Sequence, residues 1–114
     1  MNNYKDLKVW QRSIFLAKDI YVLTADFPNE EKFGLVSQMR RASVSVASNI
    51  AEGAGRGSNN DFRRFMDIAY GSLCELDTQL CISKLLGLME ESSVESLEKE
   101  ISEIQKMSYS LIKV

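Results

Sequence analysis

Apolar residues recur at intervals of three and four along four segments of the chain, the spacing that places them on one face of an α-helix. The first predicted helix covers residues 5–26. Its apolar series is Leu7, Trp10, Ile14, Ala17 and Tyr21, with Val9, Leu16, Ile20 and Leu23 widening the stripe. Pro28 disfavours helical geometry at Phe27, so this helix is expected to end before the proline.

The second predicted helix begins at Asn29, which is a residue type that caps helices, and runs to about Gly53. Its core face is expected to contain Leu35, Met39, Ala42, Val46 and Ile50. The letters SVSV alternate with period two and leave a strand at residues 43–47 as an alternative. The helical spacing continues on both sides of this segment and favours the helix.

The glycines of GAGRGS, residues 53–58, are typical of a helix end, and Ser58 with Asp61 forms a variant of the capping box that starts the next helix. The third helix is interrupted near its end by Gly87. Its seam is Phe62, Phe65/Met66, Ala69, Leu73, Leu76 and Leu80, and the fourth has Val94, Leu97, Ile101, Ile104, Ser108 and Leu111. Four such helices with short loops predict a single all-α domain, residues 1–114, folded as an antiparallel up-down four-helix bundle.

The second helix also contains a long uncharged run, from Ala42 to Ala51, in a chain where 26% of residues are charged. On a helical wheel its small residues Val44, Ala47 and Ala51 form a second face beside the core face. Because a monomeric bundle leaves one side of each helix in water, this face predicts a homo-oligomer interface. An exposed, Ser/Ala-rich helix is the alternative.

A polar stripe on each side of the central hairpin predicts two ion pairs between the second and third helices. If the hairpin is centred near residue 58, Arg41 lies opposite Glu75, and Glu52 lies opposite Arg64. Partly buried pairs of this kind would fix the register of the hairpin, and loss of one partner would cost roughly 3 kcal/mol or more.

The charge is distributed unevenly, although the net charge is only −2. Residues 1–64 hold ten Lys/Arg against seven Asp/Glu, and residues 65–114 hold four against nine.

A phosphate-loop interpretation of GAGRGS fails because a helix, not a strand, precedes it and no Gly-Lys-Ser/Thr follows. A hairpin turn is the simpler interpretation, but the arginines around it could contact nucleic-acid phosphates. The candidate RNA-binding residues are Arg40, Arg56, Arg63 and Arg64.

The sequence lacks the side chains that most catalytic and metal sites need. It has no histidine, and its two cysteines, Cys74 and Cys81, are too far apart along a helix to bridge each other and are interpreted as small core or interface residues. No enzyme activity, metal or cofactor is expected. No apolar run is long enough to span a membrane and the N-terminus has no signal region, so a cytoplasmic protein is expected.

Three segments resemble a known family in order and spacing: DLKVWQRSIFLAKDIY, FPNEEKFGLVSQMRRASVSVASNIAEGAGRGS and FRRFMDIAYGSLCEL. Over residues 4–89 the chain resembles the small proteins encoded within intervening sequences of bacterial 23S rRNA genes. The resemblance implies a four-helix bundle, and its relatives include the accessory variability protein of diversity-generating retroelements, a pentameric ring that binds a reverse transcriptase and nucleic acid. The family signature falls on Gln38, Arg40, Arg41, Ser48, Asn49, Glu52, Gly53, Arg56, Gly71, Ser72 and Glu75.

The expected function is therefore a non-catalytic, RNA-associated module that forms a homo-oligomer, a pentamer by resemblance. A ring that binds a protein client without significant nucleic-acid binding is the alternative.

Overall fold

Four α-helices form the chain, and a computed structural model describes residues 3–112 of it. The predicted domain, residues 1–114, extends two residues beyond this range at each end. The helices are α1 (Lys8–Thr24), α2 (Ser37–Gly55), α3 (Asn59–Leu85) and α4 (Glu91–Ile112). Short helical turns precede α1 at Tyr4–Asp6 (η1) and α2 at Asn29–Glu31 (η2) and Lys32–Val36 (η3).

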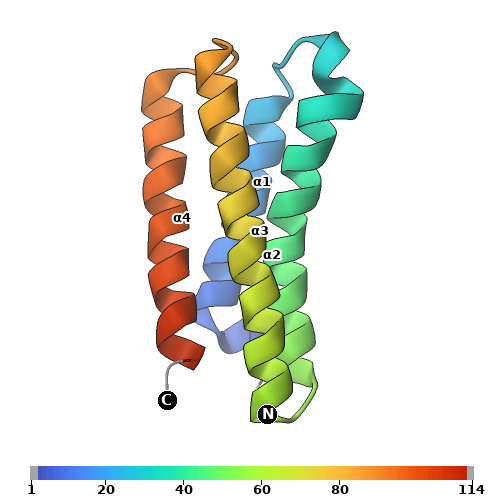
Figure 1. Cartoon of the computed structure of the whole chain (residues 1–114), viewed down its shortest axis with the longest axis vertical. Helices are drawn as coiled ribbons and strands as arrows, with labels where there is room; N and C mark the ends of the chain where they lie inside the picture. The colour runs from blue at the N-terminus through green and yellow to red at the C-terminus, as the bar shows by residue number, and fades with distance from the viewer. Residues whose placement is uncertain (1–2, 113–114) are drawn as a thin grey trace.

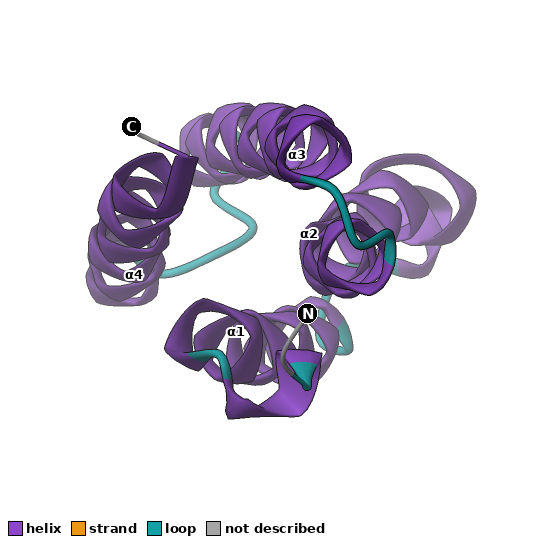
Figure 2. Ribbon diagram, turned by 90° about the horizontal axis from the view of Figure 1, so that it is seen from below, coloured by secondary structure: helices purple, strands orange, loops and turns teal. Residues whose placement is uncertain are grey.

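Successive helices run in opposite directions along a molecule of 43 × 23 × 20 Å (Figure 1). Seen along the bundle axis, α1 lies between α2 and α4, and α3 lies between the same two helices on the other side (Figure 2). The described residues contain no strand, so the strand alternative at residues 43–47 is wrong. The predicted all-α, up-down four-helix bundle is confirmed.

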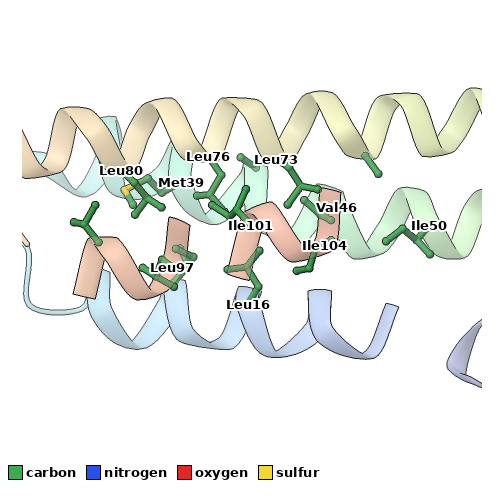
Figure 3. Close-up of a cluster of buried hydrophobic side chains, with 14 of the residues drawn as sticks. Leu16, Met39, Val46, Ile50, Leu73, Leu76, Leu80, Leu97, Ile101 and Ile104 are labelled. Atoms are coloured by element: carbon green, nitrogen blue, oxygen red, sulfur yellow. The ribbon is translucent and has the colours of Figure 1, made fainter. Parts of the chain in front are cut away.

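The space between the helices is filled by apolar side chains from all four of them (Figure 3). The predicted core positions of α2 at Met39, Ala42, Val46 and Ile50 are fully buried. The predicted seams of α3 and α4 are confirmed over most of their length. Their fully or almost fully buried members are Met66, Ala69, Leu73, Leu76, Leu80, Val94, Leu97, Ile101, Ile104 and Ser108.

The core stripe of α1 differs from the predicted series. Ile14 and Tyr21 are 40% and 44% exposed, and the buried face passes through Ser13 and Thr24 instead. Each hydroxyl donates to the carbonyl oxygen four residues earlier, Ser13 Oγ to Val9 at 2.7 Å and Thr24 Oγ1 to Ile20 at 2.6 Å. These bonds satisfy the buried hydroxyl groups, so the buried face of α1 can include two polar residues. A search for apolar positions alone does not detect them.

The start of the second helical segment is irregular. Pro28 stands at its N-cap, and the predicted side-chain cap by Asn29 does not form, because Asn29 is already the first residue of η2. The η3 turn is π-helical and kinks at Gly34, where φ is −108° and ψ is −106°. In a regular α-helix Lys32, four residues before the buried Val36, would lie on the core face. The wider turn rotates Lys32 and Phe33 towards solvent, and Phe33 is 89% exposed.

The turn between α2 and α3 follows the predicted chemistry. Ser58 Oγ accepts a hydrogen bond from the backbone N–H of Asp61 at 3.1 Å, as the capping box requires, and Gly57 has a φ of 80° that favours glycine. One turn earlier, Gly53 packs against α3. A Cβ at Gly53 would lie 2.8 Å from Phe65 Cβ and 3.3 Å from the carbonyl oxygen of Phe62.

Gly53→Ala is expected to destabilise the protein by about 1–3 kcal/mol, because the new methyl group forces α2 and α3 apart. Gly55→Ala is the matched control, since nothing lies within 4 Å of its Cβ position. That control is expected to stabilise the protein by about 0.4–1 kcal/mol through lower unfolded-state entropy. Urea unfolding of both variants measures the difference; equal stabilities would show that α2 and α3 are not held together at Gly53.

Candidate functional site

The outer seam between α2 and α3 carries four of the polar residues singled out in the sequence, Arg41, Asn49, Ser72 and Glu75. Ser72 Oγ donates to Ser45 Oγ at 3.0 Å, and Asn49 Nδ2 donates to the Ser45 hydroxyl at 2.9 Å. One turn away, Arg41 Nη2 lies 3.9 Å from Glu75 Oε2, which is the predicted pair. Both side chains are more than half exposed, at 69% and 51%, so the pair is a surface contact rather than a partly buried one.

The second predicted pair, Glu52 with Arg64, is wrong. Glu52 accepts from Arg56 at 3.1 Å within the same turn of helix, and Arg64 lies 3.6 Å from Asp61. These partners are four and three residues away along the chain, where neighbouring side chains meet without spanning two helices. The local partners therefore replace the pairing across the hairpin.

Three of the four candidate RNA-binding arginines lie at the end of the bundle formed by the α2–α3 turn, the lower end in Figure 1. The guanidinium carbons of Arg56 and Arg64 lie 5.0 and 4.7 Å from the centroid of the Phe65 ring, within the range of cation–π contacts. Arg63 is exposed and forms no ion pair with any residue in the range 3–112. It lies about 100° around α3 from Arg64, because successive residues are rotated by that amount.

Arg40 is not part of this group. It lies sixteen residues before Arg56, about 24 Å along the helix at 1.5 Å per residue. Its Nε donates to Thr24 Oγ1 at 3.0 Å and its Nη2 to the carbonyl oxygen of Tyr21 at 3.2 Å, and its guanidinium lies 4.5 Å from the Tyr21 ring centroid. Tyr21 is in the last turn of α1, so Arg40 satisfies one of the free carbonyls at that helix end.

The predicted interface face on α2 is largely covered within the single chain. Ala47 is only 6% exposed and Ala51 is half-buried, whereas Val44 is 42% exposed. The outward positions of the uncharged run are instead Val44 and Ser48. Ala47 therefore belongs to the packing of the monomer, which accounts for part of the uncharged run without a second copy.

The shortest ion pair among residues 3–112 joins the two helices that lie furthest apart in the sequence. Arg12 of α1 donates to Glu100 of α4 through Nε at 2.8 Å and through Nη2 at 2.5 Å, a bidentate arrangement. The hydrogen bond to Glu100 raises the pKa of Arg12 above its ordinary value, although burial lowers it in part. Arg12 therefore stays charged throughout the practical pH range. An Arg and a Glu 88 residues apart give no sequence signal without knowledge of how α1 packs on α4.

Both cysteines are exposed and free, so their interpretation as core residues is wrong, and the alternative of interface residues stays a prediction. Cys81 Sγ lies 3.6 Å from Glu98 Oε2, and Cys74 Sγ accepts from Gln105 Nε2 at 3.6 Å, so both lie over α4. Although the side chain is exposed, partial desolvation where it lies over α4 and the hydrogen bond to Glu98 raise the pKa of the Cys81 thiol. Cys81 is therefore a poor nucleophile at neutral pH, because the thiolate is the reactive form.

Within residues 3–112, no three His, Cys, Asp or Glu side chains converge as they would around a metal ion. Over the same range, no helix combines the length and apolar character needed to cross a membrane.

The fold and its seams define a small all-α protein of the four-helix-bundle class. The chain belongs to the family described as 23S rRNA-intervening sequence protein, whose family model matches residues 5–110. This confirms the resemblance noted in the sequence. Its fold is also that of a protein with unknown function from the S23 ribosomal protein family of Bacteroides thetaiotaomicron VPI-5482. The two are 25% identical with a TM-score of 0.83, over 93% of this chain and 99% of that one. None of the curated proteins compared with the chain matches it.

A double-mutant cycle on Arg41 and Glu75 is expected to give a coupling energy below about 0.5 kcal/mol, because an exposed pair at this distance is screened by water. The variants are Arg41→Ala, Glu75→Ala and the double variant, compared by urea unfolding. A coupling of 2 kcal/mol or more would contradict the exposed geometry and restore the role in hairpin register.

Proposed function

We propose that this protein is a non-catalytic module that assembles with copies of itself and associates with RNA through the α2–α3 end of the bundle. The observation that carries the proposal is the arginine group at this end, Arg56, Arg63 and Arg64, of which Arg63 has no carboxylate partner among the described residues. In a homo-oligomer, which we propose to be a pentamer, several copies of this arginine group would contact one nucleic-acid strand. Multivalency would then raise the apparent affinity above that of a single weak contact.

The stacked arrangement around Phe65 supports the same role. The guanidinium groups of Arg56 and Arg64 lie over the Phe65 ring, and their remaining N–H donors are available at the rim of the ring. Phosphate oxygens can accept hydrogen bonds from these donors. The turn residues from Arg56 to Ser58 are exposed beside these donors, so a strand has access to them.

A protein-binding adaptor is the second candidate. It is favoured by the local ion pairs, because Glu52 and Asp61 already offset the charges of Arg56 and Arg64. The net charge of −2 also opposes general attraction to nucleic acid.

We place the contact between copies on the outward face of α2, in the uncharged run. Val44 and Ser48 are the exposed residues of this run. On the neighbouring face of α3, Ile68 is 44% exposed, and a Cβ built on Gly71 would have nothing within 4 Å outside its own helix backbone. A glycine in mid-helix costs about 1 kcal/mol relative to alanine. Close approach of another helix would account for its presence.

Light scattering coupled to size-exclusion chromatography is expected to give the mass of about five subunits for the wild-type protein. Val44→Glu and Ser48→Glu are each expected to lower this mass, because a charge in the uncharged run would be buried against the next copy. Val22→Glu is the control, since Val22 is 61% exposed on α1. A wild-type monomer would overturn the oligomer proposal, and an unchanged mass of both variants would move the interface elsewhere.

The double variant Arg63→Glu/Arg64→Glu is expected to weaken RNA binding several-fold and to lower the slope of log K against log salt by about 1–1.5. Lys99→Glu/Lys106→Glu is the control, which makes the same change of charge on α4. The measurement is a salt titration of a fluorescein-labelled RNA by anisotropy. Binding that both double variants weaken equally would indicate net charge alone, and absence of binding by the wild type would favour the adaptor.

A further inference from the structure

The joint between α1 and α2 lies at the top of Figure 1, at the opposite end of the bundle from the α2–α3 turn and its arginines, Arg56, Arg63 and Arg64. Its side chains form a shallow groove of about 390 Å³. Its lining combines two aromatic rings with three cations: Tyr21, Phe33, Lys32, Arg40 and Arg41, above Val36 and a serine. No acidic residue lines it, although the chain as a whole carries a net charge of −2. The groove is therefore suited to an anionic partner.

Phe33 is the most exposed large apolar side chain of the described residues, at 89%. The η3 turn holds it outside the core, and the Nζ of Lys32 lies 5.5 Å from its ring centroid. An isolated exposed phenylalanine needs no explanation. Here the ring stands beside three cations at the edge of a hollow, which is the combination used to stack a base and hold its phosphate.

The cations differ in how far they are already engaged. Arg40 is bound to Thr24 and Tyr21 and so forms a fixed wall of the groove. Arg41 has only Glu75, at 3.9 Å on the surface, and Lys32 has no ion-pair partner among residues 3–112. Lys32 and Arg41 are therefore the charges available for an incoming phosphate.

We propose that this groove binds a single-stranded nucleic acid, with a base stacked on Phe33 and the adjacent phosphates on Lys32 and Arg41. Every nucleotide of a strand carries both an aromatic face and an anionic group. An acidic peptide meets both requirements only if an aromatic side chain falls at the right position, so the lining favours the strand. The inference rests on the proposed RNA association where the strand is RNA, but it assigns a different surface to it.

The test uses the full-length protein and fluorescein-labelled 12-nucleotide probes of one sequence, as single-stranded RNA, single-stranded DNA and duplex. Phe33→Ala is expected to weaken single-strand binding by about fivefold or more, the effect of losing one stacked base. Lys32→Ala is expected to weaken it less and to lower its salt dependence. Phe15→Ala is the matched control, because Phe15 is an exposed phenylalanine of α1 that does not line the groove.

Two further measurements locate the effect. Thermal unfolding of Phe33→Ala is expected to match the wild type, since the ring is almost fully exposed. NMR titration with the RNA probe is expected to shift the amide signals of residues 32–41 more than those of residues 56–64. Signals that shift only at residues 56–64 would overturn the groove assignment.

The outcomes separate this inference from the proposed function. RNA binding that depends on Arg63 and Arg64 but not on Phe33 would overturn the groove and support the α2–α3 end. Phe33-dependent binding of DNA alone would support the groove and overturn RNA as the partner. Binding of neither single strand, a duplex bound as tightly as the strands, or an aspartate- and glutamate-rich peptide bound more tightly and through Phe33 would each overturn the inference.

Discussion

The close approach of α2 and α3 at Gly53 is the constraint on which the surface of this protein depends. With no side chain at this position, Phe65 and the backbone of Phe62 pack directly against α2. Once the two helices touch there, the register of the hairpin is set for its whole length. Ser45 then meets Ser72, and Arg41 comes within reach of Glu75. The polar residues along the seam therefore follow from the contact rather than creating it, and the exposure of the Arg41–Glu75 pair agrees with this.

The architecture was predictable because the apolar spacing of α2, α3 and α4 is regular and the sequence from Ser58 to Asp61 contains a recognisable capping box. The face of α1 was less predictable, because Ser13 and Thr24 are buried with their hydroxyls bonded to their own helix. Such bonds use only local backbone groups, so they make a polar residue compatible with the core while leaving no mark in a hydrophobic pattern.

The candidate site was predicted in part. The pairing of Arg41 with Glu75 follows from helical geometry alone, since a hairpin centred near residue 58 places them opposite each other. The partner of Arg64 depends on which carboxylate lies nearest to its flexible side chain. Asp61 in the same helix is nearer than Glu52 across the hairpin. Arg40 looks like a surface cation in the sequence, but the end of α1 supplies a carbonyl and a hydroxyl that bind it. Such tertiary partners are absent from any single segment of sequence.

The η3 turn separates two kinds of sequence constraint within one continuous helical segment. From Val36, the last residue of η3, through α2, the segment contributes to the shared core, where neighbouring helices respond to a change of one methylene group. Before Val36, Lys32 and Phe33 are exposed, and the principal contacts of η3 are with η2 and α2. Substitutions there change the shape and charge of the groove at almost no cost in folding. Relatives with the same bundle are thus free to diverge in the shape and charge of this end of the molecule.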